Sequence, residues 1–419
     1  MFLIDYSKKM MTKTFRKTVY KFTETPPPVF ANRFGVYLHV PFCHTKCTFC
    51  PFYKELYNDE LKDRYVKAMV KEISNTTIQG ESEWIYFGGG TPNTLNIEDL
   101  GAILRALEEK MTISNIGIEL LPSLVTKDYL DGLREIGFSK ISIGIETFQE
   151  ESIKKTGRRG STYQHISEII HHAQKMGLHV AVDLMIGLPG QTAETFDDDI
   201  EKIIQIRPDQ ITIYPYMVIR NVSAVPSCST AEQFVHIERA AEHLETSGYE
   251  RKSVWIFVLP NTEDQDVYDS SKDELISDYC GFGPASFSTY AGYKVVKPEL
   301  DVWLEGIESG NLQSFVAPKT KSTDDWRWFA NRIYDLKLET SYKFPMYIRF
   351  FDFILRLSGY HKDGYLTEKG RYFSHEITKA VVESLPFPLQ DPSCVENFHE
   401  YLELKKEITE SERISIFTK

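Results

Sequence analysis

The sequence predicts an α/β fold with a parallel sheet, either a partial (β/α) barrel or a flat doubly wound sheet. From about residue 34 to 215, short apolar runs alternate with amphipathic helical patterns, which is typical of such folds. The unusual residues follow directly after these runs: a cysteine loop after the first, GGGTP after the second and GLPGQT after the fifth. Both architectures place active sites at the carboxyl ends of the strands, so periodicity alone leaves the choice open.

The apolar runs predict six strands, namely FGVYLHV (34–40), WIYF (84–87), IGIEL (116–120), KISIGI (140–145), HVAVDLMI (179–186) and QITIY (210–214). The first connecting helix carries an apolar face from Leu61 to Ile73, and the second has Asn96 as its N-cap. The third begins near Thr126 and ends at Gly137, and further helices are predicted near 162–176 and 193–205.

We predict four parts, because 419 residues exceed a single small core. They are an extended N-terminal arm (1–33), the β/α core (34–220), an extension that closes it (221–318) and a helical C-terminal domain (319–419), in which DGYLTEKGRYF looks like a small winged helix. The aromatic run at 342–357 is interpreted as a buried helix rather than a membrane contact, because Arg349, Asp352 and Arg356 interrupt it and it is short for a span.

Composition excludes some partners. The net charge of -12 argues against nucleic acid, or an anionic membrane, as the principal partner, although a local basic patch stays open. The first residues lack the apolar core of a secretory signal, so we expect a cytoplasmic protein whose thiols stay reduced. Clustered cysteines then indicate metal ligands or catalysts, and the dispersed Cys228, Cys280 and Cys394 are expected to be free thiols.

The stretch CHTKCTFC places Cys43, Cys47 and Cys50 on one short loop. Structural zinc sites usually have four ligands, commonly from two Cys-x-x-Cys pairs, and no second pair follows. Three thiolates on a [4Fe-4S] cluster would leave one iron without a protein ligand and open to chemistry. A zinc site, or a fourth ligand from His39 or His44, is the alternative.

Five motifs, YLHVPFCHTKCTFC, YFGGGTP, SIGIETF, GRRGS and DLMIGLPGQT, appear in this order between about residues 34 and 300. Together they resemble the radical S-adenosylmethionine (SAM) superfamily, in the branch of oxygen-independent coproporphyrinogen dehydrogenase, the related heme chaperone and the class C methyltransferases. The resemblance implies a partial (β/α)6 barrel with a [4Fe-4S] cluster on the three cysteines and SAM at the open iron. Reductive cleavage of SAM would then give a 5'-deoxyadenosyl radical.

The glycine loop offers bare backbone to a ligand, at Gly88, Gly89 and Gly90 followed by Thr91. By itself a triple glycine indicates a tight turn. The resemblance implies that it contacts SAM, and it assigns the same role to Tyr37, Phe49 and Glu119.

A second SAM site is implied by Arg158 in GRRGS and by Asp183. Asp183 is an acid inside an apolar strand, where an unpaired charge would be costly, so it needs a partner or a function. Glu146 stands where the dehydrogenase has a glutamine, which leaves the binding mode of this second SAM open.

Three other motifs are less specific. The acids at 197–199 are predicted to lie in the first turn of a helix, where they complement its dipole and need no function. GFGPASFSTY (281–290) resembles a glycine-rich segment that closes the family's core domain. YPYM (214–217) follows the sixth strand and either faces substrate or packs the barrel.

The predicted function is a class C-type radical methyltransferase acting on a flat aromatic substrate such as menaquinone, with a flavodoxin- or ferredoxin-type electron donor. Aromatic lining from Phe52, Tyr53, Tyr214 and Tyr216 favours this hypothesis. Pro51, Phe52 and Tyr53 replace the Gly-Cys-Asn of the dehydrogenase, which disfavours coproporphyrinogen decarboxylation. The alternatives are a radical tetrapyrrole enzyme, including a methyltransferase that opens heme anaerobically, and a heme-binding chaperone.

Overall fold

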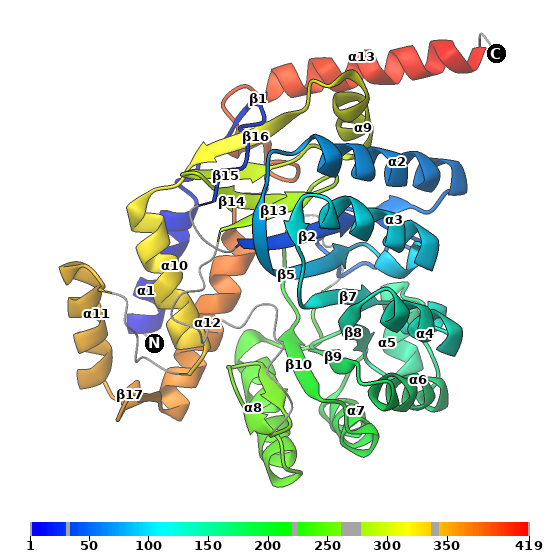
Figure 1. Ribbon diagram of the computed structural model, residues 1–419. Helices are drawn as coiled ribbons and strands as arrows, with labels where there is room; N and C mark the ends of the chain where they lie inside the picture. The colour runs from blue at the N-terminus through cyan, green and yellow to red at the C-terminus, as the bar shows by residue number, and fades with distance from the viewer. Residues whose placement is uncertain (1, 31–33, 220–224, 261–277, 337–342, 418–419) are drawn as a thin grey trace.

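The structure is a computed structural model that describes residues 2–30, 34–219, 225–260, 278–336 and 343–417 (Figure 1). The centre of its sheet is a run of six neighbouring parallel strands in this described part: β2 (Phe34–Val40), β5 (Gly80–Gly89), β7 (Ile116–Leu120), β8 (Phe138–Glu146), β9 (His179–Ile186) and β10 (Gln210–Pro215). All six predicted strands are confirmed. They follow one another in chain order because each is joined to the next by a helical crossover.

The six strands do not close into a ring. Beyond β2 the sheet continues with parallel β13 (Tyr279–Phe282), whereas beyond β10 it continues with antiparallel β12 (Ile256–Val258) and β11 (Glu250–Arg251). Because the two outer strands of the set have different partners, the architecture is a partial barrel. The strands are buried on both faces, which explains their nearly continuous apolar sequences.

The crossover helices are α2 (Asp59–Asn75), α3 (Ile97–Glu108), α4 (Lys127–Glu135), α6 (Tyr163–Lys175) and α7 (Ala193–Ile206), and they cover the predicted segments. Asn96 caps α3 through a capping box, as predicted, and α4 begins near Thr126, as predicted, with the Thr126 side chain as its N-cap. Gly137 follows α4 with a φ of 100°, a conformation that favours glycine. An additional short helix, α5 (Glu150–Thr156), lies between β8 and α6.

The extension adds antiparallel strands beyond β13 in the order β14 (Phe287–Tyr290), β15 (Tyr293–Val296), β16 (Gln313–Pro318) and β1 (Lys21–Glu24). Helix α8 (Thr230–Thr246) follows β10 in the chain, and α9 (Leu300–Ser309) packs against α2. Strand β1, the first in the chain, is therefore an edge strand of the sheet, next to β16.

The N-terminal segment differs from the extended arm that the sequence predicted. Residues Phe2–Phe15 form helix α1, which packs against α12 (Glu368–Ser384) and α10 (Lys321–Tyr334) (Figure 1). Ile4, Met11 and Phe15 share one helical face and enter the same apolar cluster as Trp326. The proline-rich stretch 25–30 has no regular structure, in keeping with the interpretation of that part.

The C-terminal region is helical, as predicted. Helix α11 (Met346–Leu357) is followed by a hairpin of β17 (His361–Lys362) and β18 (Tyr365–Leu366), then by α12 and by α13 (Phe398–Phe417). The motif at 363–373 thus spans the hairpin turn and the start of α12. The division of the chain at residues 33, 220 and 318 stays a prediction.

The prediction of a buried helix over the aromatic run is only half right. Ile348, Phe351 and Leu355 are buried, but Phe350 and Phe353 on the other side of α11 are 64% and 52% exposed. Helices of the described residues include none with both the length and the apolarity to cross a bilayer.

Candidate functional site

The cysteine loop leaves the end of β2 and is fastened at its base. The amide of Glu55 donates to the Pro41 carbonyl at 2.8 Å, and the amide of Tyr57 donates to the Cys43 carbonyl at 2.9 Å. In the middle of the loop, the Thr48 amide donates to the Thr156 carbonyl at the end of α5, at 3.0 Å. The three cysteines therefore lie on a loop that is held at both ends and at its centre.

The loop thiols lie in an apolar environment. Cys43 is buried, and Cys47 and Cys50 pack against a cluster formed by Phe49, Met185, Leu188 and Tyr216. Burial raises the pKa of the Cys43 and Cys47 thiols, whereas the nearby Arg158 cation opposes this rise at Cys47. All six cysteines of the chain are free.

These surroundings fit an iron-sulfur cluster. Metal ligation requires thiolates, and a cluster of positive irons supplies the compensation that burial otherwise denies them. The Thr91 hydroxyl already donates to the Cys43 sulfur at 3.4 Å, a contact that stabilises a thiolate. In the described residues, no three His, Cys, Asp or Glu side chains converge closely enough to hold a single metal ion.

His39 is already engaged by its neighbours. Its Nδ1 shares a hydrogen bond with the Tyr37 hydroxyl at 3.1 Å, and its Nε2 lies 3.2 Å from the Tyr53 carbonyl oxygen. Burial lowers the His39 pKa to about 4, so the ring is neutral. Since both ring nitrogens have partners, His39 connects β2 to the end of the cysteine loop and does not fit the alternative role of a fourth ligand.

The glycine loop at the end of β5 packs directly onto β2. Gly88 pairs with His39, and the Gly90 amide donates to the Val40 carbonyl at 2.7 Å. A Cβ on Gly89 would lie 2.7 Å from the His39 ring, and one on Gly90 would lie 2.8 Å from the Pro41 carbonyl. The glycines are therefore required for the strand ends to meet, and this close approach brings Thr91 to Cys43.

Glu119 ends β7 beside this loop. Its Oε2 accepts a hydrogen bond from the Gly89 amide at 3.3 Å, and a Cβ on Gly88 would lie within 3.2 Å of both the Tyr37 ring and Glu119. Burial, with the nearby Asp183 carboxylate, raises the Glu119 pKa to about 8. Tyr37, Gly89 and Glu119 thus form one polar group. That they contact SAM stays a prediction.

Glu146, Arg158 and Phe49 form a second group across the same strand ends. Arg158 Nη2 lies 3.4 Å from Glu146 Oε1 and donates to the Gly144 carbonyl. The guanidinium is also 6.0 Å from the centroid of the Phe49 ring, a cation–π contact. Glu146 has a φ of 65°, which is unusual for a residue other than glycine and turns the chain sharply after β8.

Asp183, in β9, has the partner that the sequence required, because it accepts a hydrogen bond from the Ser142 hydroxyl at 2.8 Å. Its charge raises the pKa of Glu119, and Asp183 pairs with Gly144 in the sheet, so Asp183 lies close to both polar groups. The residues assigned to a second SAM therefore lie close together. Glu146 ends β8, Asp183 lies in β9, and Arg158 lies in the segment after α5. Whether they bind SAM stays a prediction.

Asp199 was wrongly interpreted as a first-turn acid. It lies in the second turn of α7 and is fully buried, accepting from the Thr147 hydroxyl at 2.6 Å and from the Phe148 amide at 3.0 Å. It fixes the chain directly after Glu146. No local sequence pattern indicates this contact, because Thr147 and Phe148 are about fifty residues away in the chain.

The predicted aromatic lining divides into two kinds. Phe52 and Tyr214 are 58% and 40% exposed, and they are open to a substrate. Tyr216 is buried against the cysteine loop, and the Tyr53 hydroxyl donates to Glu55 at 2.7 Å. Tyr53 and Tyr216 therefore support the loop, which corrects their assignment as lining.

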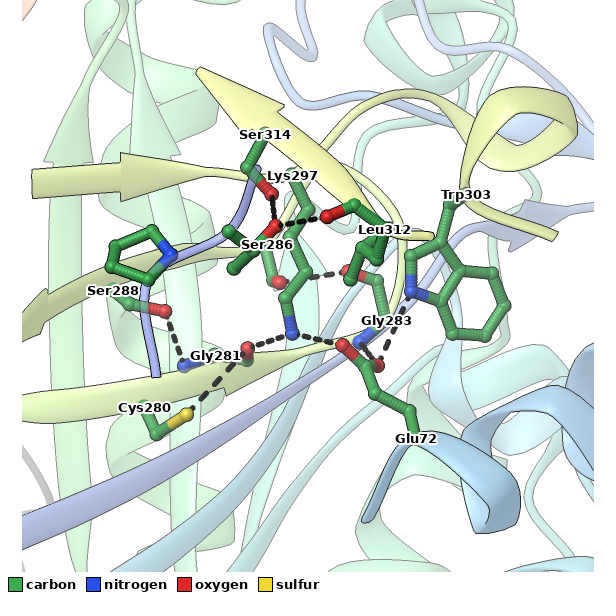
Figure 2. Close-up of polar contacts among 12 residues, drawn as sticks. Glu72, Cys280, Gly281, Gly283, Ser286, Ser288, Lys297, Trp303, Leu312 and Ser314 are labelled. Carbon is green, nitrogen blue, oxygen red and sulfur yellow. Dashed lines mark hydrogen bonds and ion pairs between the residues drawn. The ribbon is translucent and has the colours of Figure 1, made fainter. Parts of the chain in front are cut away.

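The glycine-rich segment 281–290 begins in β13, which pairs with β2, and Figure 2 shows its polar contacts. The Gly283 amide donates to Glu72 Oε2 at 2.9 Å, and the Trp303 indole donates to the same oxygen at 3.2 Å. Lys297 forms a buried ion pair with Glu72 and donates to the Gly281 carbonyl at 2.6 Å. Gly283 has a φ of 87°, and a Cβ there would lie 2.7 Å from the His39 carbonyl oxygen, so the segment supports the strand that leads to the cysteine loop.

Comparison with known proteins identifies the core. Residues 37–203 match the family model described as the radical SAM superfamily. The chain is 26% identical over 275 residues to oxygen-independent coproporphyrinogen III oxidase of Escherichia coli K12, covering 62% of this chain and 58% of that protein. It is 26% identical over 323 residues to anaerobilin synthase of E. coli O157:H7, covering 73% and 71%.

Two further comparisons agree. Heme chaperone HemW of Lactococcus lactis is 27% identical over 281 residues, covering 63% of this chain and 72% of that protein. The structure of E. coli coproporphyrinogen III oxidase (HemN) superposes with a TM-score of 0.70 at 21% identity, covering 88% of this chain and 97% of that one, which shows the same fold. The chain therefore has a radical SAM domain, a family that implies a [4Fe-4S] cluster and SAM, and its homologues are the HemN and HemW branch of that superfamily.

Proposed function

We propose that the protein is a radical SAM enzyme that transfers a methyl group to a flat conjugated substrate, with a tetrapyrrole as the favoured substrate class. The observation that supports this most is the position of Arg158. It lies beside Cys47 of the cysteine loop and beside Glu146 of the second polar group, so one mouth of the barrel holds both sets of residues.

Cys43, Cys47 and Cys50 would hold a [4Fe-4S] cluster. This cluster would supply one electron to SAM, which would break a carbon–sulfur bond and give methionine and a 5'-deoxyadenosyl radical. Glu119 and the backbone of Gly89 and Gly90 would bind the polar end of SAM. The apolar cluster around Phe49 and Met185 keeps water away from the site.

The second polar group is the reason for proposing methyl transfer. Glu146, Arg158 and Asp183 offer both charge signs at the same strand ends, which suits a second molecule of SAM. In a methyl transfer this second SAM leaves as S-adenosylhomocysteine, while the first yields 5'-deoxyadenosine. The exposed rings of Phe52 and Tyr214 would contact the flat face of the substrate.

The relatives' names favour a tetrapyrrole over a quinone, since they refer to coproporphyrinogen, anaerobilin and heme. A quinone such as menaquinone is the second candidate substrate, because two exposed aromatic rings suit any flat ring. Heme chaperoning is the rival function. We further propose a cytoplasmic location and a flavodoxin- or ferredoxin-type electron donor.

The deciding experiment is an anaerobic assay of the reconstituted, reduced protein with SAM and each of three additions: heme, coproporphyrinogen III and menaquinone. We expect both 5'-deoxyadenosine and S-adenosylhomocysteine to form with the true substrate. A chaperone would instead bind heme stoichiometrically, seen by absorbance, with little turnover of SAM. Formation of 5'-deoxyadenosine alone, with loss of carbon dioxide from coproporphyrinogen, would point to decarboxylation.

The matched variants are Cys43→Ala and Cys228→Ala. Both remove a free thiol, but only Cys43 belongs to the loop. We expect Cys43→Ala to abolish formation of 5'-deoxyadenosine and Cys228→Ala to retain it. Equal activity in the two variants would exclude the loop as the cluster site.

A further inference from the structure

Helix α11 is apolar on two opposite sides. Ile348, Phe351 and Leu355 face the interior and join the apolar cluster of the C-terminal region. The opposite side carries four large apolar residues spaced four, three and four positions apart, which places them on one face of a helix. They are Met346, Phe350, Phe353 and Leu357, with exposed fractions of 84%, 64%, 52% and 74%.

We call these four residues the α11 stripe. A helix that is apolar all round is normally buried or sits at an interface, and a contiguous apolar patch on a surface marks a site of interaction. Phe351, Ile348 and Leu355 already anchor the helix, so the stripe is not needed for packing. Helix α11 lies at the outer edge of the molecule, on the side away from α13 (Figure 1).

Basic side chains border the stripe. Arg349 and Arg356 are exposed and, seven residues apart, lie along the same edge of the helix. Lys343 precedes α11, and Lys362 lies on the adjacent hairpin, both exposed. The acid within α11, Asp352, forms an ion pair with Arg356 at 3.0 Å, and its Oδ1 lies 3.0 Å from His361 Nε2.

The edge of the stripe is thus basic in a chain whose net charge is -12, although Asp363 and Glu368 follow nearby. This charge argues against a second copy of the chain as the occupant, because a twofold contact would bring the arginines of both copies together. It favours an anionic partner. Apolar aromatic residues flanked by arginine and lysine are typical of helices that lie in the interface of an anionic membrane.

We infer that the α11 stripe docks the protein reversibly on an anionic lipid surface. Twelve residues of helix span about 18 Å, which is shorter than the roughly 30 Å of the hydrocarbon core, so α11 lies in the plane of the surface. Phe350 and Phe353 enter the headgroup layer, and Arg349 and Arg356 meet lipid phosphates. This inference does not depend on the reaction proposed above.

The test is co-sedimentation of the full-length, cluster-loaded protein with vesicles of phosphatidylcholine, with and without phosphatidylglycerol. We expect binding to the phosphatidylglycerol vesicles that weakens as salt is added. The double variant Phe350→Ser/Phe353→Ser should lose about tenfold or more in partition, because two phenyl rings no longer leave water. The matched control is Val235→Ser/Leu402→Ser, which removes two other exposed apolar side chains, on α8 and α13, and should bind as the wild type does.

Several results would overturn the inference. They are the absence of binding by the wild-type protein, equal binding by the two double variants, and salt-insensitive binding to pure phosphatidylcholine. Analytical ultracentrifugation without lipid completes the test. A dimer that dissociates in Phe350→Ser/Phe353→Ser, with no vesicle binding, would assign the stripe to a second copy instead. Unchanged thermal unfolding and cluster absorbance of each variant show that the fold is intact.

Discussion

Arg158 connects several parts of the candidate site. It contacts Glu146, the Gly144 carbonyl and the Phe49 ring, and its charge acts on Cys47. A Cβ on Gly144 would lie 2.9 Å from Arg158 Nη2, so the glycine leaves room for the guanidinium. An arginine held at the edge of a dry site by neutral and acidic partners is suited to bind a carboxylate.

Replacement of this residue separates the two proposed roles of SAM. In Arg158→Gln we expect formation of S-adenosylhomocysteine to fall about tenfold, the value of one charge-assisted hydrogen bond, while 5'-deoxyadenosine continues to form. Both nucleosides are measured in the same anaerobic reaction. The adjacent exposed Arg159→Gln is the control and should leave both unchanged. A parallel loss of both nucleosides in Arg158→Gln would contradict a separate second SAM site.

Glu119 gives a pH-dependent prediction. Its folded-state pKa of about 8 lies above the ordinary value of 4.5, so between these values the folded protein holds a proton that the unfolded chain releases. The contribution of Glu119 to stability is therefore present at low pH and is lost as the pH rises towards about 8. The Glu119→Gln variant does not titrate. Without SAM, its stability relative to the wild type should increase through this window and level off above it.

Chemical denaturation of both proteins across this pH range measures the difference. A difference that stays constant from below pH 6 to about pH 8 would show that Glu119 is ionised in the folded state.

At the scale of elements, most of the fold could be predicted. The six strands are predicted from continuous apolar runs because they are buried on both faces. The N-cap Asn96 and the start of α4 near Thr126 could be predicted because helix starts are signalled locally in the sequence. The N-terminal helix was missed because α1 is stabilised by packing on α12, more than 350 residues away. The exposed apolar side of α11 was not predicted, because a run of aromatic residues does not show which sides of the helix are buried by other elements.

The network of Figure 2 joins segments that are distant in sequence. Glu72 on α2 pairs with Lys297 after β15, 225 residues later, and also accepts from Gly283 and from Trp303 on α9. No local pattern predicts such a pair. Its carboxylate and ammonium are both almost fully buried, so each depends on the other for compensation.

Lys297→Met should therefore destabilise the protein by roughly 3–5 kcal/mol, because it leaves the buried Glu72 carboxylate without a compensating charge. The double variant Glu72→Gln/Lys297→Met should recover much of this loss, because glutamine is neutral and its oxygen still accepts from Gly283 and Trp303. Denaturant unfolding measures all three proteins. Arg64→Met is the control, because Arg64 pairs with Glu308 on the surface, and it should cost about 1 kcal/mol or less. Failure of the double variant to recover stability would show that the charge pair itself is needed.

At the scale of the whole molecule, the C-terminal region reaches the cysteine loop. The Gln390 side-chain amide donates to the Pro51 carbonyl at 2.5 Å, and the Val218 amide, after β10, donates to Glu383 at 2.8 Å. A small hollow lies between these contacts and the end of α1, lined by residues that include Arg16, Ile219 and Gln390. The end of α12 and the segment after it therefore contact the barrel beside the cysteine loop.

This contact predicts an effect on the cluster from a residue far away in sequence. Gln390→Leu removes the hydrogen bond to the residue after Cys50, and a bond worth about 1 kcal/mol corresponds to roughly a fivefold change. We expect the cluster absorbance of this variant to decay several-fold faster in air. Gln205→Leu, at an exposed position on α7, should decay as the wild type does. Equal decay in all three proteins would mean that the C-terminal region does not protect the loop.

The parts of the candidate site that are continuous sequence motifs could be predicted. The parts that depend on contacts between distant residues could not. The cysteine triplet and the glycine loop are continuous motifs, and the structure brings them together through Thr91 and Cys43. The roles of Asp199 and His39 could be assigned only from the structure. Asp199 is buried, and both ring nitrogens of His39 already have hydrogen-bond partners.

The central claim is that the loop of Cys43, Cys47 and Cys50 holds a [4Fe-4S] cluster with one iron open to SAM. Electron paramagnetic resonance of the anaerobically reconstituted and reduced protein, recorded before and after SAM is added, tests it most directly. We predict a reduced-cluster signal whose g-values shift when SAM binds, and which is lost in Cys43→Ala. A cluster signal that SAM leaves unchanged, or a protein that takes up zinc and no iron, would contradict the account.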